Sequence, residues 1–362
     1  MTTRKYNFNP GPATLPFESL QEAQKELLDY HGAGMSILEI SHRSKEFEAI
    51  LAETKSLMRK IMGIPDTYEI LFLGGGASLQ FTMVPMNFLT KDKKADYIIT
   101  GSWSKKAHKE AKLFGQANVA ATTEVDGKFR RIPKQSELKL DPGAEYVHLT
   151  SNNTIFGTQF QTFPNIGTKP LFADMSSDIL SRRVDVTKFG MIYAGAQKNL
   201  GPAGVTVIIL RKDLVSKIGA NIPTLLDYRT HIEKDSLYNT PPVFPIYIMK
   251  LVLKWVDKQG GVDAVEKINN QKAEILYGSI DKYKDFYRST VDTDSRSKMN
   301  VTFRLPSEEL EKEFIDKGAA NNFHGLKGHR SVGGIRVSMY NALPLEGIQK
   351  LTEFMKKFKE SH

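Results

Sequence analysis

The chain has 362 residues, of which 40% are hydrophobic and 25% charged, and its net charge at pH 7 is +9. This length predicts one large domain and a smaller one, and the complete absence of cysteine excludes disulfides, thiolate metal sites and cysteine nucleophiles. No apolar run approaches the roughly 20 residues that a membrane span needs, and residues 1–7 contain no apolar signal-peptide core.

The excess of basic residues indicates which classes of molecule the protein binds. Lysines are spread along the chain between acidic residues, without zinc-finger spacing or an aromatic RNA-binding pattern. We therefore expect acidic small molecules as substrates, and no nucleic acid, membrane or metal. The lack of cysteine and of a signal peptide predicts a cytoplasmic location.

The N-terminal region predicts a turn and two helices. Residues 9–13 are rich in Pro and Gly. Residues 19–28 carry apolar side chains at a three-to-four spacing, within a helical stretch that reaches about Tyr30, and residues 47–62 form a second amphipathic pattern. His42 and Arg43 stand together just before this second helix. They are either an exposed lead-in to the helix or an anion clamp in which Arg43 grips a carboxylate.

A glycine-rich turn follows the first predicted strand. Residues 68–73 are apolar and end in Gly74–Gly76, Ala77 and Ser78, and a helical pattern starts at Leu79. Strand, glycine turn and helix can bind a phosphate, because free backbone N–H groups at the helix start point at the anion. The pattern matches neither the P-loop nor the dinucleotide fingerprint. It is therefore a phosphate cup for another ligand, or only a tight turn.

Two further strands place polar or flat side chains at the same predicted sheet edge. Residues 97–100 lead to Trp103, and residues 146–150 lead to the polar loop 151–154. The Trp103 ring either stacks on a flat ligand or packs beneath its loop.

The combination of Asp174 and Lys198 gives the clearest chemical indication. Asp174 ends the predicted strand 170–173, and Lys198 lies in a Gly- and Pro-rich turn before the apolar run 205–210. Taken separately, Lys198 is either a loop-tip lysine that reaches water or a buried lysine, and Asp174 either caps the next turn or holds a cationic ligand atom. Burial would lower the pKa of the lysine and make its amine a nucleophile. A strand-end Asp followed by such a Lys suits pyridoxal phosphate (PLP), whose ring nitrogen pairs with the carboxylate while its aldehyde bonds to the amine.

The last third of the chain predicts a smaller α/β domain. Helical patterns cover about 245–256, 262–277 and 308–317, with Gly318 as a C-cap, and strands cover 299–305 and 335–340. The loop 325–334 is basic and glycine-rich, and Arg336 follows it directly. From the residues alone, Arg336 is either a surface cation or a carboxylate-binding fork.

Several motifs together resemble the phosphoserine aminotransferase family, within the class V, fold-type I group of PLP enzymes, over nearly the whole chain. They lie at residues 7–13, 41–44, 74–81, 174–178, 194–204 and 237–242, and the last two are highly specific together.

The resemblance implies a role for each matching residue. Lys198 would carry the cofactor as a Schiff base, one per subunit, and move the proton, while Asp174 would pair with the ring nitrogen. The remaining cofactor contacts would be Ala77, Ser78, Trp103, Thr154 and Gln197, with Asn239 and Thr240 reaching the cofactor of the neighbouring subunit. Substrate carboxylates and phosphate would meet Arg43, Arg336, His42, His329 and Arg330.

The resemblance also implies an architecture and a reaction. The fold would be a large α/β domain, residues 16–257, with a mostly parallel sheet flanked by helices, and a smaller α/β domain made of 1–15 and 258–362. A homodimer would transfer the amino group of L-glutamate to 3-phosphohydroxypyruvate in serine biosynthesis. Action on 4-phosphohydroxy-L-threonine stays open. The alternatives are a class V aminotransferase for an unphosphorylated amino acid and a non-catalytic phosphate- or nucleotide-binding protein.

Overall fold

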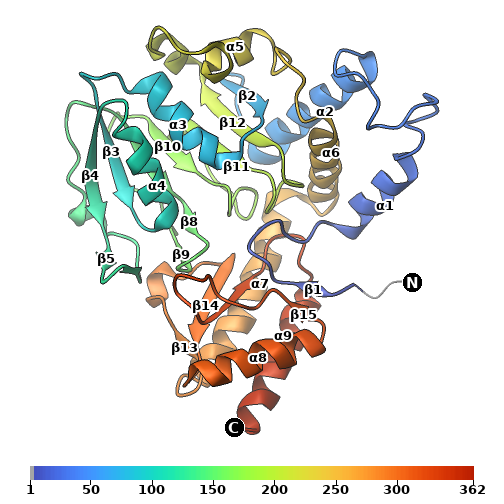
Figure 1. The fold of residues 1–362 in the computed structure, drawn as a ribbon, viewed down its shortest axis with the longest axis vertical. Coiled ribbons are helices and arrows are strands. Elements are labelled where there is room, and N and C mark those ends of the chain that lie inside the picture. Colours follow the sequence, from blue (N-terminus) through green and yellow to red (C-terminus); the bar gives the residue numbers. More distant parts are fainter. Residues whose placement is uncertain (1–3) are drawn as a thin grey trace.

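A seven-stranded sheet forms the centre of the larger, upper part of the molecule in Figure 1. The computed structural model describes residues 4–362; residues 1–3, the start of the segment in which no signal peptide is expected, lie outside the described residues. The strand order is β2-β12-β11-β10-β7-β3-β4. The strands are β2 (Tyr68–Leu73), β3 (Lys94–Ile99), β4 (Gln116–Thr122), β7 (Ala144–Thr150), β10 (Leu171–Asp174), β11 (Met191–Gly195) and β12 (Thr206–Arg211).

The direction of the strands determines at which edge of the sheet the loops that follow them lie. Only β12 runs antiparallel to its neighbours, β11 and β2, and the pairs among β4, β3, β7, β10 and β11 are all parallel. The carboxyl ends of β2, β3, β7, β10 and β11 therefore lie along one sheet edge, which is where ligands bind in open α/β sheets.

Helices cover both faces of this sheet, which explains the nearly continuous apolar strands. One face packs against α3 (Gly76–Phe88), α4 (Ser102–Ala111) and α5 (Tyr228–Glu233). The other packs against α2 (Lys45–Met62) and α6 (Val243–Lys258), and α1 (Phe17–Glu26) lies on α6. Helix α2 begins where the Ser44 hydroxyl accepts a hydrogen bond from the backbone N–H of Phe47, and it ends at Gly63 in the left-handed region.

The C-terminal unit, residues 258–362 together with strand β1 (Tyr6–Asn7), has its own apolar core. It consists of α7 (Gly261–Lys282), β13 (Arg288–Ser289), β14 (Asn300–Arg304), α8 (Glu308–Ala320), β15 (Phe323–His324), β16 (Ile335–Ser338) and α9 (Leu345–Glu360). Strand β1 pairs with β15, so the chain start joins this unit (Figure 1). The separate core supports the predicted domain limits, which stay a prediction.

The predicted α/β architecture is confirmed, and several predicted element limits are wrong. Helix α1 ends at Glu26 instead of about Tyr30, and Leu28, beyond this end, is 85% exposed. Helix α3 starts at Gly76 instead of Leu79, and Gly318 lies inside α8, whose C-cap is Asn321. Elements that were not predicted include α9, β4, β13 and the short pairs β1–β15, β5 (Glu124–Val125) with β6 (Lys128–Phe129), and β8 (Asn152–Asn153) with β9 (Thr158–Gln159). Within residues 4–362, no helix combines the length and apolar composition that crossing a membrane requires.

Phe314 holds the aromatic centre of the C-terminal unit. Its ring is fully buried and lies 5.1 Å from the rings of Phe354 and Phe358. Phe314→Ala should lower the free energy of unfolding by about 3–5 kcal/mol, because it removes buried apolar area and leaves a cavity. Urea denaturation followed by circular dichroism measures this. Leu113→Ala, at a side chain that is 74% exposed, is the control and should change the value by less than about 0.5 kcal/mol. Equal effects of the two changes would contradict the packing described.

Candidate active site

One cavity at the carboxyl edge of the sheet collects most of the predicted site residues. Loops after β2, β3, β7, β10 and β11 contribute to it, and the C-terminal unit closes it from the other side. Nine predicted residues line it: Ala77, Ser78, Trp103, Thr154, Asp174, Gln197, Lys198, His329 and Arg336.

Lys198 projects from the short turn between β11 and β12. The turn is held by its backbone, because the N–H of Ala196 donates to Val205 O at 3.0 Å and the N–H of Gly201 donates to Ala196 O at 2.9 Å. Burial lowers the pKa of Lys198 to about 8; Asp174 opposes this shift and Arg336 adds to it. A substantial fraction of the amine is therefore neutral near physiological pH, as a nucleophile requires.

The N-terminal segment closes over this lysine. Gly11 has φ +132°, and a Cβ there would lie 3.2 Å from Lys198 Cγ, so a glycine is needed at this contact. The N–H of Ala13 also donates to Gln197 O at 2.9 Å. The turn that carries Lys198 is thus fixed from two directions.

Asp174 ends β10 and is buried beside the lysine. One carboxylate oxygen accepts the N–H of Ser176 at 2.9 Å. Burial raises the pKa of Asp174, while the hydrogen bonds of Ser176 and the charge of Lys198 oppose that shift. Thr150 lies opposite it in register on β7, and the buried Thr150 hydroxyl has no protein partner.

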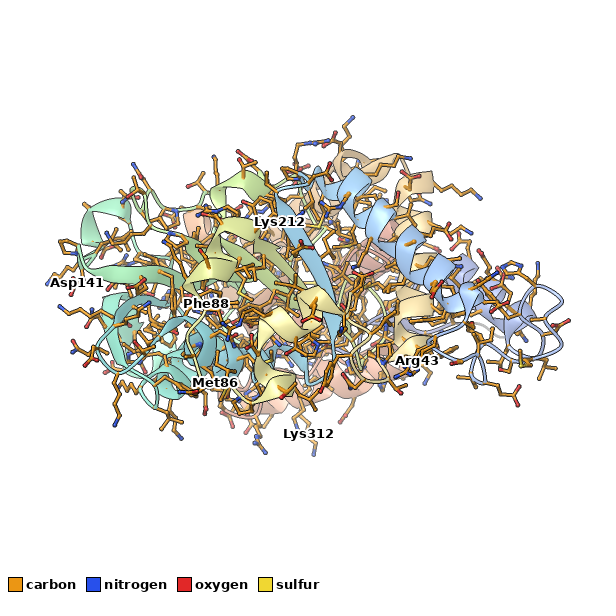
Figure 2. The ribbon with its side chains drawn as sticks, turned by 90° about the horizontal axis from the view of Figure 1, so that it is seen from above. Arg43, Met86, Phe88, Asp141, Lys212 and Lys312 are labelled. Atoms are coloured by element: carbon orange, nitrogen blue, oxygen red, sulfur yellow. The ribbon has the colours of Figure 1, made fainter. Side chains whose placement is uncertain are left out.

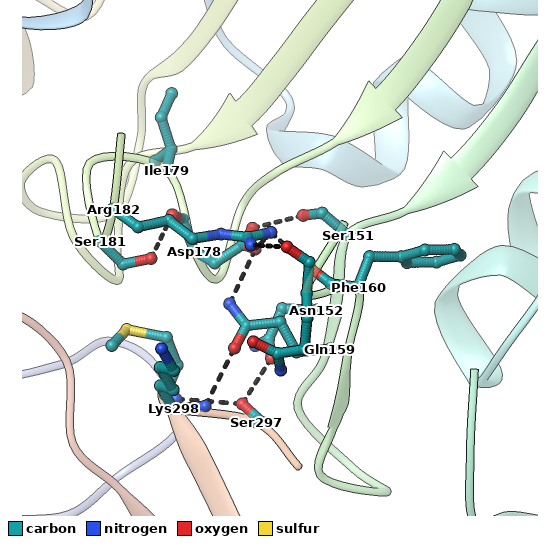
Figure 3. A network of polar contacts seen from close by, with 12 residues as sticks. Ser151, Asn152, Gln159, Phe160, Asp178, Ile179, Ser181, Arg182, Ser297 and Lys298 are labelled. Carbon is teal, nitrogen blue, oxygen red and sulfur yellow. Dashed lines mark hydrogen bonds and ion pairs between the residues drawn. The ribbon is translucent and has the colours of Figure 1, made fainter. Parts of the chain in front are cut away.

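A second buried carboxylate, Asp178, is fully engaged by the protein (Figure 3). It accepts hydrogen bonds from the Ser151 hydroxyl and, at 3.1 Å, from Gln159 Nε2. Arg182 Nη2 lies 3.9 Å from it. Asp178 therefore has its own counter-charge, and Asp174 is the carboxylate that stays available to a ligand.

The glycine turn leads into α3 as an anion site would. Gly75 and Gly76 have φ +86° and +65°, and a Cβ on Gly75 would lie 2.7 Å from Leu79 Cβ. No side chain caps the helix, and its first turn contains no acidic residue. The first N–H groups, near Ala77 and Ser78, are therefore free to bind a phosphate.

Trp103, Thr154 and Arg336 form a connected wall. Trp103 Nε1 donates to Thr154 Oγ1 at 3.1 Å, and Arg336 Nη1 donates to Thr154 O at 3.1 Å. Arg336 is only 6% exposed, and its buried Nε has no partner in the protein. A buried cation with a free N–H is suited to an acidic ligand. The pKa of nearby His329 is lowered by burial, and the charges of Arg336 and Arg330 add to this shift.

Five predicted residues do not line this cavity. Arg43 is exposed at the molecular surface, its Nε 3.4 Å from His42 Nε2 (Figure 2). Asn239 and Thr240 are exposed in the stretch before α6, and Arg330 is exposed on the loop beside the cavity. Their roles stay predictions, and those of Asn239 and Thr240 were expected to involve a second subunit.

Other lining residues were not among the predicted ones, and those with polar side chains are Thr150, Asn152, Ser176 and Ser177. The available signal was their position, since each lies at or directly after the end of a parallel strand. Together with the nine residues, they fit a ligand that has an aldehyde, a basic ring nitrogen and a phosphate. The amine, the free carboxylate and the uncapped helix start each match one of these groups.

Comparison with known proteins agrees with this geometry. Residues 5–351 match the family described as aminotransferase class-V. The chain is 56% identical to phosphoserine aminotransferase of Lysinibacillus sphaericus strain C3-41, with 100% of both chains covered, and 56% identical to that of Bacillus subtilis strain 168, with 99% of both covered.

Solved structures give the same grouping. The phosphoserine aminotransferase from Bacillus circulans subsp. alkalophilus superimposes with a TM-score of 0.97 at 53% identity, covering 99% of both chains. A PLP-bound phosphoserine aminotransferase from Trichomonas vaginalis gives a TM-score of 0.93 at 37% identity, covering 98% of this chain and 100% of that one. With the family match over nearly the whole length, the conclusion is that this chain belongs to the class-V aminotransferases.

Proposed function

We propose that the protein transfers the amino group of L-glutamate to 3-phosphohydroxypyruvate, giving O-phospho-L-serine and 2-oxoglutarate. One observation carries the proposal: a single cavity brings together a lysine with a lowered pKa, a free buried carboxylate and a buried arginine with an unpaired N–H. Relatives that are 56% identical over the full chain and bear the name phosphoserine aminotransferase support the choice of substrates.

The cofactor of this family is PLP, and the residues of the cavity fit it. When bound, PLP supplies an aldehyde that exchanges amino groups and a protonated ring that withdraws electrons. The Asp174 carboxylate would keep the ring nitrogen protonated, and Ala77 and Ser78 at the start of α3 would hold the phosphate, with Gln197 beside them. Trp103 and Thr154 would fix the ring, because their mutual hydrogen bond holds both side chains in place.

Lys198 has two tasks in this scheme. Its neutral amine would bind the cofactor in the resting enzyme, and once a substrate amine takes its place, Nζ would remove the proton from the substrate Cα. A pKa of about 8 suits both tasks, since proton transfer works best when the pKa lies near the working pH.

The acidic substrates would be held from the C-terminal unit. Arg336 lines the cavity, and its guanidinium, whose Nε has no protein partner, would bind a substrate carboxylate, while His329 with Arg330 would meet the phosphate. We also propose a homodimer, in which exposed Asn239 and Thr240 reach the partner's cofactor and His42 and Arg43 reach substrate. Apolar Leu28 and Leu38, 85% and 61% exposed, lie on the loop before His42 and would be covered by a second copy. A cytoplasmic location stays a prediction.

A coupled assay with L-glutamate and 3-phosphohydroxypyruvate, run beside a visible spectrum, tests the proposed reaction. Hydroxypyruvate, which lacks the phosphate, should give a kcat/KM at least about 100-fold lower.

The variant Lys198→Ala should lose the long-wavelength absorbance band of the cofactor, and its kcat should fall at least about 10³-fold, because both tasks of the amine are lost. Lys105→Ala, at an exposed lysine paired with Glu124, is the control and should keep both. Equal rates on the two acceptors would favour a class-V enzyme for unphosphorylated substrates, and a protein that takes up no PLP would support a non-catalytic role.

The lowered pKa of Lys198 predicts how the cofactor-free enzyme takes up PLP. Only the neutral amine attacks an aldehyde, so the uptake rate should rise with pH and level off above about pH 8. In Asp174→Asn the inflection should move to lower pH, because the carboxylate that favours the charged amine is gone. Stopped-flow absorbance after mixing with PLP measures both curves. An inflection above pH 10 in the unmodified protein would contradict this account of the site.

The proposed dimer predicts complementation between inactive subunits. Lys198→Ala and Thr240→Val homodimers should each be nearly inactive, whereas co-expressed subunits should regain activity. In the mixed dimer, one site combines an intact Lys198 with the partner's intact Thr240. At full exchange about half of the dimers are mixed and each has one good site, so about a quarter of normal activity is expected. No recovery, with mixed dimers verified by mass spectrometry, would place Thr240 in its own chain's site or in none.

A further inference from the structure

The sheet of the C-terminal unit has two faces of opposite character. Strand β14 lies between β13 and β16, and alternate residues of β14 and β16 point into the apolar core. The other face is polar, and four of its residues are also buried: Asn300, Thr302, Arg336 and Ser338 are 0%, 8%, 6% and 2% exposed. Because Asn300 pairs with Ser338 and Thr302 with Arg336 in register, all four side chains lie on one side of the sheet.

This polar face contacts a single segment of the large sheet region, residues 152–156, at every second residue. Asn152 Nδ2 donates to Asn300 Oδ1 at 2.8 Å. Arg336 Nη1 donates to Thr154 O, and Thr302 Oγ1 donates to Phe156 O, both at 3.1 Å. The segment includes Thr154, the hydrogen-bond partner of Trp103. Strand β16, which carries Arg336, is therefore joined directly to the cavity wall that contains Thr154 and Trp103.

Asn300 makes three side-chain hydrogen bonds at this junction. Its Nδ2 donates to Ser338 Oγ at 3.0 Å and to Tyr340 Oη at 3.1 Å, while its Oδ1 accepts from Asn152. Both donor hydrogens are therefore used, and its oxygen is paired as well.

On the cavity side of the junction, Asn152 also has three side-chain hydrogen bonds (Figure 3). Its Nδ2 also donates to Ser177 Oγ at 2.8 Å, and Ser297 Oγ donates to its Oδ1 at 2.5 Å. Asn152 and Ser177 both line the cavity. Asn300 thus links the strand of Arg336 to the cavity wall without touching the cavity itself.

We propose that Asn300 is a positioning residue that sets the place of Arg336 relative to the Lys198 cavity, acting through Ser338 on its own sheet and Asn152 across the junction. The inference rests on the proposed function, in which Arg336 binds the substrate carboxylate. Arg336 itself has only one hydrogen bond to the opposite side, so the register of its strand must be fixed by neighbours. Displacement of a binding group by about 1 Å costs up to about 100-fold in kcat/KM, and for a group that only binds the carboxylate we expect this loss in KM.

The test measures carboxylate binding in Asn300→Ser. The KM of L-glutamate and the inhibition constant of glutarate, a dicarboxylate without an amino group, should both rise about tenfold, with kcat changed less than about threefold. The matched control is Tyr287→Phe, which removes one buried hydrogen bond, to Met355 O at 2.8 Å, inside the same unit. It should lower the melting temperature without changing either constant.

A double variant shows whether Asn300 acts through Arg336. With Arg336→Lys already present, adding Asn300→Ser should raise the glutarate constant less than about twofold, because the group it positions is gone. Ser338→Ala, a milder break of the same link, should raise the constants in the same direction, and it carries the test if Asn300→Ser does not fold. Unchanged constants in both variants, or a full tenfold rise on top of Arg336→Lys, would overturn the proposal. An unmodified enzyme that is inactive with glutamate, or that glutarate does not inhibit, would instead refute the proposed function.

Discussion

The central constraint of this structure is that an amine and a carboxylate are buried together at one sheet edge. Removing Lys198 from water favours its neutral form, and removing Asp174 from water also favours its neutral form, yet each group favours the charge of the other. Arg336 adds a third buried charge, which shifts Lys198 further toward the neutral amine. The site keeps a reactive amine and a usable carboxylate because these effects oppose one another.

Neighbouring residues keep Lys198 and Asp174 available to a ligand. Asp178, only four residues after Asp174, has its own partners in Ser151, Gln159 and Arg182, and its charge acts on Lys198 less than that of Asp174 does. Asp174 accepts a backbone N–H from Ser176 and keeps its other oxygen for a ligand. The antiparallel strand β12 follows the turn that carries Lys198, and backbone hydrogen bonds across this turn fix the amine in place. Rigid placement of this kind makes the charged groups effective in catalysis.

The sequence allowed prediction of what depends on local pattern. Apolar strands that end in Gly, Asp or a polar loop locate the sheet edge, and the spacing of Asp174 and Lys198 suggests their chemistry. Contacts that depend on register between distant strands could not be predicted. Asn300 is an ordinary polar residue in a strand pattern, and its role appears only when β14 pairs with β16 and faces segment 152–156. The position of Thr150 at the site likewise depends on its register with Asp174 in the neighbouring strand. The exposed positions of Arg43 and Thr240 show a different limit, because a single chain does not contain the surface they were expected to meet.

The contact of Gly11 with Lys198 also constrains how the molecule is made. The cavity needs residues near the start of the chain, the sheet edge from its middle, and Arg336 close to its end. The initial segment is moreover held by strand pairing with β15, whose residues are synthesised 317 positions after their partners in β1, as in the pair Tyr6 and Phe323. During translation, the central sheet can therefore form while its ligand site is still incomplete. The cavity that binds PLP is therefore complete only after nearly the whole polypeptide has left the ribosome. A chain that ends before β16 would lack Arg336 and with it one wall of the site, even if its central sheet had formed.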